Sequence, residues 1–184
     1  MTAMTPIELS QMRRLTVAQG DSLASSDASV IFTTVLGSCV AVCLYDGAAG
    51  VGGMNHFLLA DPAPIAGEDA HLLNRYGLHS MELLINAMLK RGAARFGLKA
   101  RIYGGATMRE GLGDIGRRNI EFARKFLANE KIPVLGENVG GTSARRIEFR
   151  PAAGLSRCKV VSSKPVENII VKAPPASLGD VELF

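Results

Sequence analysis

A cysteine, a histidine and a hydroxyl residue lie close together in a glycine-rich stretch that runs from Thr33 to His56 and reads TTVLGSCVAVCLYDGAAGVGGMNH. The reactive form of a cysteine is the thiolate, and a neighbouring imidazole can take the thiol proton and later give it to a leaving group. A hydroxyl such as that of Thr33 can hold the imidazole in the useful tautomer. The stretch therefore predicts nucleophilic catalysis by Cys39 with His56 as the base.

Cys39 is expected in a sharp turn, because Gly37 and Ser38 separate it from the apolar run that precedes it. A turn can expose a side chain that the interior of a strand would bury. Backbone amides in such a turn can also stabilise an oxyanion. We therefore interpret Ser38 and Gly37 as candidates for oxyanion or substrate binding.

The chain after Cys39 is expected to fold back as an antiparallel hairpin. The run Val40–Tyr45 ends at Asp46-Gly47, and Asp-Gly is a strong hairpin signal. The returning run Val51–Leu59 carries His56. An antiparallel return can bring this histidine across from the cysteine, which is the pairing that a thiol nucleophile needs.

The cysteines also have structural interpretations. Cysteine is among the most buried residue types, and we expect Cys43 and Cys158 to be core residues. A metal site built from Cys39, Cys43, His56 and Cys158 is disfavoured, because C-x-x-x-C lacks the usual spacing of a metal knuckle. We expect no metal ion and no other cofactor.

Several motifs in order along the chain resemble the CheD family of chemoreceptor glutamine deamidases. They are LGSCVAVCLYD with GGMNHFLL, then IYGGATM from Ile102, IGRRNI around Asn119, and GENVGGTSARRIEF from Gly136 to Phe149. Together they span about residues 30 to 160, and an ordered set is more specific than any single motif. The resemblance places the family's catalytic cysteine, histidine and threonine on Cys39, His56 and Thr33, with Thr34 next to the last of them.

The resemblance implies an activity and partners as well. The expected reaction is hydrolysis of selected glutamine side chains to glutamate on methyl-accepting chemotaxis receptors, through a cysteine thioester. A CheC-type phosphatase is implied as a partner. Two alternatives stay open: an adaptor that binds receptor or phosphatase without catalysis, and a glutamyl methyl ester hydrolase that uses the same nucleophile.

Length and composition predict one compact globular domain. Of 184 residues, 47% are hydrophobic and 21% are charged. The net charge of +4 comes from basic residues interleaved with 17 acidic ones, and there is no tryptophan, so nucleic-acid binding is disfavoured. Three cysteines and no signal-peptide pattern favour the reducing cytoplasm, and no segment predicts membrane insertion.

The predicted elements are short strands and two amphipathic helices, at residues 70–92 and 115–129. They indicate an α/β fold, and the resemblance implies a single-domain three-layer α-β-β sandwich with mostly antiparallel or mixed sheets. We divide the chain into an N-terminal extension (1–27), a deamidase domain (28–164) and a C-terminal tail (165–184).

Two further motifs are given structural interpretations. Gly111, Gly113 and Gly116 match G-x-G-x-x-G, but this match does not directly follow a strand, so nucleotide binding is disfavoured. Arg145-Arg146 is interpreted as solvated loop charge in preference to a site for an acidic partner.

Overall fold

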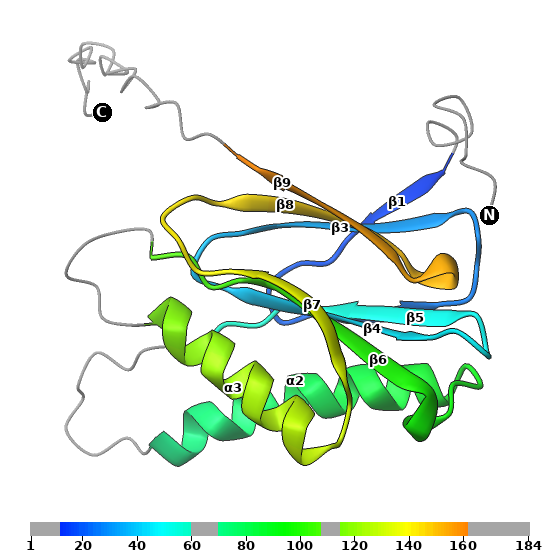
Figure 1. Ribbon diagram of the computed structural model, residues 1–184, viewed down its shortest axis with the longest axis horizontal. Coiled ribbons are helices and arrows are strands. Elements are labelled where there is room, and N and C mark those ends of the chain that lie inside the picture. The colour runs from blue at the N-terminus through cyan, green and yellow to red at the C-terminus, as the bar shows by residue number, and fades with distance from the viewer. Residues whose placement is uncertain (1–11, 60–69, 108–114, 162–184) are drawn as a thin grey trace, which may run out of the picture.

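The computed structural model describes residues 12–59, 70–107 and 115–161. Two β-sheets are stacked face to face, and two helices cover the far side of one of them (Figure 1). The layers are therefore helices, a central sheet and an outer sheet. This arrangement confirms the predicted α-β-β sandwich.

Each sheet mixes antiparallel and parallel strands. The outer sheet has the order β1-β3-β8-β9, with β1 (Arg13–Thr16), β3 (Val30–Leu36), β8 (Arg145–Arg150) and β9 (Leu155–Val160). The central sheet has the order β2-β5-β4-β6-β7, with β2 (Ser22–Ser25), β5 (Val51–Asn55), β4 (Val40–Asp46), β6 (Leu98–Gly104) and β7 (Val134–Val139). Only the pairs β1–β3 and β6–β7 are parallel among the described strands.

Strand β4 separates the two halves of the core. Val42 and Leu44 pack into the cluster beneath the helices, whereas Ala41 and Cys43 pack into the cluster between the sheets. Side chains of a strand alternate between its faces, so a strand buried on both sides reads as the nearly continuous apolar run seen in this sequence. The expected hairpin with β5 forms across the Asp46-Gly47 turn.

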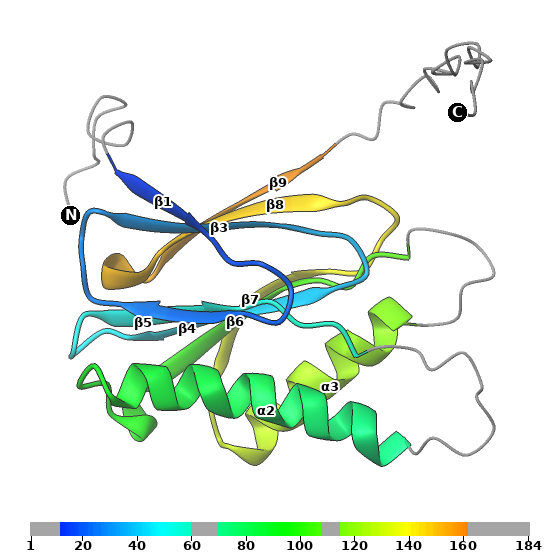
Figure 2. The ribbon, with the colours of Figure 1, turned by 180° about the vertical axis from the view of Figure 1, so that it is seen from behind.

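The two helices bury one stripe each on the central sheet. Helix α2 (Ala70–Leu89) contacts β2 and β5, and α3 (Ile115–Asn129) contacts β4 and β6. Figure 2 shows α2 running along the lower face of that sheet. Both predicted helices are confirmed, the second at its predicted bounds. Along the described part of the chain, no helix is long and apolar enough to cross a membrane.

The region expected as an N-terminal extension belongs to the folded domain from residue 12 onward. Strand β1 pairs with β3, β2 pairs with β5, and Val17 between them is fully buried. These strands are only four residues long and mostly polar, so they lack the apolar run that predicted the central strands. Residues 1–11 and the predicted tail at 165–184 lie outside the described residues.

Arg145 is also placed differently from the prediction. It lies in β8 and is 4% exposed, and its guanidinium donates to the backbone carbonyls of Asn138 and Gly140. A buried guanidinium needs acceptors, which the end of β7 supplies. Arg145 therefore ties the two sheets together, whereas Arg146 is exposed as expected. Of the glycine motif, Gly111 and Gly113 lie outside the described residues.

Candidate active site

The candidate site lies at one end of the layer between the two sheets. Cys39 occupies the turn between β3 and β4 and is half-buried, as its glycine-serine context predicted. His56 follows the last residue of β5 and is 7% exposed. The end of the outer strand β3 approaches the same place and brings Thr34 to His56.

The strand register puts Cys39 and His56 on the same face of the central sheet. The pairs Cys43–Met54 and Val40–Phe57 keep one register on both sides of His56. If this register is continued along both chain segments, Cys39 lies two residues before the position opposite His56. The two residues are therefore diagonal neighbours on one face of the sheet. Diagonal neighbours on one face are about 7–8 Å apart at their α-carbons, within the reach of two side chains that point toward each other. The sequence prediction that the hairpin brings thiol and imidazole to one place is thus consistent with the register.

A glycine loop after β6 holds the cysteine turn by its carbonyl groups. The amide of Gly105 donates to the carbonyl of Cys39 at 2.7 Å, and the amide of Ala106 donates to that of Gly37 at 2.8 Å. A β-carbon on Gly104 would lie 2.1 Å from the Cys39 carbonyl oxygen, and the φ of Gly104 is 108°. Only glycine fits there, so the GGATM motif serves to fix the turn that carries Cys39.

Asn119 on α3 links the cysteine turn to the segment that follows His56. Its side-chain nitrogen donates to the Ser38 carbonyl at 2.8 Å, and its side-chain oxygen accepts from the Leu59 amide at 2.7 Å. Asn119 is fully buried, so its bond to Leu59 is shielded from water and its bond to Ser38 is partly shielded. One side chain thereby sets the spacing between the two chain segments that carry the thiol and the imidazole.

Replacing Asn119 by alanine is expected to lower the free energy of unfolding by about 1–3 kcal/mol, because a buried amide and a buried carbonyl each lose their partner. The replacement is also expected to lower kcat. Urea unfolding and steady-state kinetics measure both quantities. Asn129→Ala at the exposed end of the same helix is the matched control, with an expected change within about 0.5 kcal/mol. Equal effects of the two replacements would contradict this role of Asn119.

The hydrogen bonds of His56 define its tautomer. Its Nδ1 lies 3.0 Å from Thr34 Oγ1 and 3.2 Å from the Val17 carbonyl oxygen. The Thr34 hydroxyl donates to that same carbonyl at 2.9 Å, so its hydrogen is already used. Nδ1 must then carry the hydrogen, because a carbonyl can only accept. The other nitrogen, Nε2, is buried and has no partner, and it holds the lone pair that a general base needs.

The main chain of His56 is fixed as well. Its amide donates to the Asp21 carbonyl at 3.1 Å, and its carbonyl accepts from the Gly20 amide at 2.7 Å. Residues 17–21 therefore contact the histidine both at its backbone and at its ring nitrogen Nδ1. Rigid placement of this kind is what lets a base keep a productive orientation.

Burial sets the protonation states of the pair. Burial lowers the pKa of His56, and the Val17 carbonyl and the charge of Asp21 oppose this shift to a smaller extent. Burial raises the pKa of the Cys39 thiol, with its own backbone amide opposing the shift. At neutral pH the Cys39 thiol and the His56 imidazole are therefore both neutral. If Cys39 is the nucleophile, as the sequence predicts, its thiolate has to form by transfer of the thiol proton to a base.

These directions predict the pH dependence of turnover. Protonation of His56 removes the base, so kcat/KM should fall as the pH drops through a value below 6.5, the ordinary histidine pKa. On the basic side, activity should persist beyond pH 9.0, the ordinary cysteine value, because the thiol pKa is raised. A pH–rate profile of kcat/KM measures both limits. An acid limb centred above 6.5 would contradict the buried, neutral imidazole.

Thr34, and not Thr33 as predicted, places its hydroxyl next to His56. In β3, alternate residues face the layer between the sheets, and Phe32, Thr34 and Leu36 are buried there while Thr33 is partly exposed. A shift of one residue moves a side chain to the opposite face of a strand. Two adjacent threonines could not be assigned to faces from the sequence. A catalytic role for Thr33 itself remains a prediction.

Replacing Thr34 by valine keeps the shape of the side chain and removes one of the two acceptors near Nδ1, leaving the Val17 carbonyl. We expect kcat to fall about tenfold, the effect of one lost hydrogen bond in a site of this kind. Thr34→Ser, which keeps the hydroxyl, should retain most activity. Thr33→Val is the matched control on the neighbouring position. A larger loss in Thr33→Val than in Thr34→Val would show that the other hydroxyl orients the ring.

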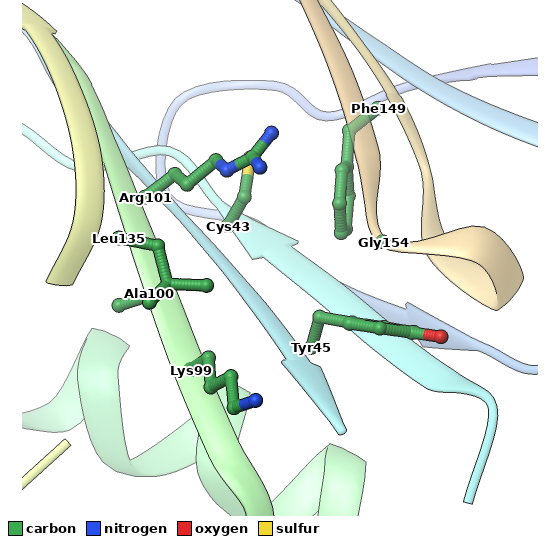
Figure 3. A pocket seen from close by; sticks show the side chains of 8 residues that line it. All are labelled: Cys43, Tyr45, Lys99, Ala100, Arg101, Leu135, Phe149 and Gly154. Carbon is green, nitrogen blue, oxygen red and sulfur yellow. The ribbon is translucent and has the colours of Figure 1, made fainter. Parts of the chain in front are cut away.

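The other two cysteines do not join the site. Cys43 is 2% exposed, and burial strongly raises the pKa of its thiol. Its side chain points between the sheets beside Arg101 and Phe149, at a cavity of about 30 Å³ (Figure 3). That space holds a water molecule or two but not a glutamine side chain. Cys158 packs at the edge of the same core cluster.

Within residues 12–59, 70–107 and 115–161, no three His, Cys, Asp or Glu residues are grouped so as to hold a metal ion.

Several residues of the site were missed in the sequence. Val17 uses only its carbonyl, and the partners of Thr34 are set by strand register. Gln19 contacts the predicted nucleophile: the Cys39 thiol donates to its side-chain oxygen at 3.4 Å. These contacts carry no sequence signal, because they join segments far apart in the chain. Asn119 does carry one, since it is polar and adjoins the inward-facing Ile120 on an amphipathic helix.

Comparisons with known proteins agree with the motifs. The family model described as CheD chemotactic sensory transduction matches residues 58–160, a segment that begins just after the hairpin. A protein of Zymomonas mobilis named "Probable chemoreceptor glutamine deamidase CheD" is 53% identical over 97% of this chain and 96% of its own length. That alignment is long enough to include the stretch with Cys39 and His56.

Two further relatives carry similar names. A protein of a Ruegeria species, "Probable chemoreceptor glutamine deamidase CheD 1", is 52% identical over 78% of this chain and 74% of its own length. A "Probable chemoreceptor glutamine deamidase CheD" of a Caulobacter species is 48% identical, with 91% of each chain covered. With a matching family model over more than half of its length and relatives of this identity, the chain belongs to the CheD family.

Proposed function

We propose that this protein hydrolyses selected glutamine side chains to glutamate on the cytoplasmic part of methyl-accepting chemotaxis receptors. The names of its relatives support this activity and substrate. One observation carries the chemistry: His56 Nε2 is buried without a partner, on the face of the sheet that also carries Cys39. A thiol and an unpaired, correctly protonated imidazole form the minimal apparatus for acyl transfer.

The first half of the reaction forms a thioester. His56 Nε2 removes the proton of Cys39, and the sulfur attacks the carbonyl carbon of the substrate amide. The imidazolium then gives this proton to the nitrogen, which leaves as ammonia when the carbon–nitrogen bond breaks. Thr34 and Val17 hold Nδ1–H throughout, so the same ring nitrogen takes and returns the proton.

The negative oxygen of the tetrahedral intermediate needs hydrogen-bond donors. The carbonyls of Gly37, Ser38 and Cys39 all accept hydrogen bonds, either from the glycine loop or from Asn119. We propose that amides of this fixed turn, Ser38 and Gly37 included, serve as donors. Such donors contribute about 3–4 kcal/mol each in enzymes of this mechanism.

The second half of the reaction is hydrolysis of the thioester. Neutral His56 removes a proton from water, the water oxygen attacks the acyl carbon, and the carbon–sulfur bond breaks. The imidazolium returns this proton to the leaving sulfur, and the carboxylic acid that forms releases its proton to solvent. The products are a glutamate carboxylate and the free thiol, so the enzyme is ready for another cycle. The lowered pKa of His56 favours this step, because the base must be neutral again after each ammonia release.

Mass spectrometry of a receptor cytoplasmic fragment tests the proposal. Conversion of a glutamine to glutamate adds about one dalton, whereas hydrolysis of a glutamyl methyl ester removes about fourteen, and both would pass through the same thioester. We expect the one-dalton gain with wild-type enzyme and none with Cys39→Ala. An unchanged receptor mass together with retained binding would favour the adaptor alternative.

We also propose a CheC-type phosphatase as a partner, which a binding assay with the purified phosphatase tests.

A further inference from the structure

Gln19 brings a carboxamide into contact with the nucleophile. The Cys39 thiol donates to its side-chain oxygen at 3.4 Å, and both side chains reach the surface at this point. The functional group at this distance is the same group that the proposed reaction attacks. Attack requires the carbonyl carbon of a substrate to come within about 3–3.5 Å of the sulfur. A substrate carboxamide and that of Gln19 cannot both occupy this position.

The backbone of Gln19 is held in a defined turn. The Asp21 amide donates to the Ala18 carbonyl at 3.0 Å, and the φ of Gly20 is 95°. These features define a type II turn with Gln19 in its second position. The same turn is bonded to the main chain of His56 through Gly20 and Asp21. The Gln19 side chain therefore extends toward Cys39 from a support that is fixed to the catalytic histidine.

The contact favours the resting form of the thiol. A carboxamide oxygen accepts a hydrogen bond from S–H but repels a thiolate, so it stabilises the protonated state. Sulfur is a weak donor and the contact is exposed, which means that it can be broken without unfolding the turn. A weak contact of this kind lowers the fraction of enzyme molecules that are ready to bind substrate. It does not block the site completely.

We propose that Gln19 is a built-in occupant of the substrate position: its carboxamide covers the Cys39 sulfur in the free enzyme and leaves when the carboxamide of a substrate glutamine arrives. The identity of the displacing group rests on the proposed deamidase function. The covering of the sulfur by Gln19 does not rest on it. The occupant holds the nucleophile in its unreactive form until a substrate competes for the same place.

Alkylation of Cys39 by iodoacetamide tests the covering without any receptor. At neutral pH, Gln19→Ala should react about threefold to tenfold faster than wild type, because the thiol loses an acceptor and becomes open. Gln19→Glu should react more slowly than wild type, since a carboxylate accepts from S–H more strongly and repels the thiolate. Peptide mass spectrometry measures the rate at Cys39 alone. Thr16→Ala, an exposed polar position on β1, is the matched control and should react like wild type.

We therefore expect alkylation to be fastest in Gln19→Ala, intermediate in wild type and slowest in Gln19→Glu. A slower reaction of Gln19→Ala would show that the side chain donates to the thiolate, and equal rates in all variants would show that it does not cover the sulfur. Either result overturns the proposal.

Kinetics with the receptor fragment test the displacement. In Gln19→Ala, KM should fall by about the factor by which alkylation rises, because a competitor is gone. A raised KM would show instead that Gln19 binds the substrate, and would overturn the proposal. If the alkylation order holds while no variant releases ammonia, the covering of the sulfur stands and the deamidase function fails.

Discussion

Replacing Cys39 by alanine is expected to abolish ammonia release from a receptor fragment, with a fall in kcat of at least about 10³-fold. Without the sulfur there is no thiol to attack the substrate amide, and the thioester cannot form. Binding of the fragment should remain, because the turn is held by its carbonyls and not by its side chain. Ammonia is measured in a coupled assay, and binding is measured by calorimetry.

Cys158→Ala is the matched control for this experiment. Cys158 is a partly buried cysteine in β9 that packs at the edge of the core between the sheets. We expect its replacement to leave ammonia release within about twofold of wild type. Retained turnover in Cys39→Ala, or loss of turnover only in Cys158→Ala, would show that another group is the nucleophile.

Replacing His56 by alanine is expected to lower kcat by about 10²–10⁴-fold at neutral pH, the usual effect of losing a general acid–base group. The loss should be larger than in many cysteine enzymes, because burial raises the pKa of the Cys39 thiol and little thiolate exists without a base. The activity that remains should therefore increase with pH up to and beyond 9.0, the ordinary thiol pKa. Wild-type activity should be flat over the same range.

His79→Ala provides the control, since His79 is an exposed histidine on α2. Its replacement should leave both kcat and the pH profile unchanged. A His56→Ala variant with a flat pH profile and near-normal turnover would mean that the thiol is activated without the imidazole. The proton-transfer mechanism would then be wrong.

The sequence predicted the elements that carry the site better than the contacts inside it. The Asp46-Gly47 turn and the apolar runs on either side of it predicted the hairpin of β4 and β5, because both signals are local. The helix at 115–129 was predicted at its bounds for the same reason: its apolar stripe repeats at helical spacing and its end is marked by polar residues.

Contacts between distant segments could not be predicted from the residues. Thr34 was passed over for Thr33 because the face of a strand depends on its register with partners elsewhere, here β1 and β8. Strands β1 and β2 were missed because edge strands of four polar residues have no apolar pattern. Arg145 was interpreted as loop charge because nothing local shows that the carbonyls of Asn138 and Gly140 would receive its guanidinium.

The layer order came from the family resemblance and not from periodicity. The apolar run of β4 shows that both of its faces are buried, but it does not show whether a helix or a sheet covers each face. In the structure, helices cover one face and the outer sheet covers the other. Cys39 packs against the cluster between the sheets, and Thr34 of the outer sheet contacts His56 on that same side.

The most direct test of the thioester mechanism is the mass of an enzyme–receptor adduct after an acid quench of a single turnover. Acid stops deacylation, so a thioester should appear at the combined mass of enzyme and receptor peptide less that of ammonia, about 17 daltons, and fragmentation should place it on Cys39. We expect this adduct in wild type and its absence in Cys39→Ala. Formation of glutamate by wild type without any adduct, or at an undiminished rate in Cys39→Ala, would contradict this mechanism.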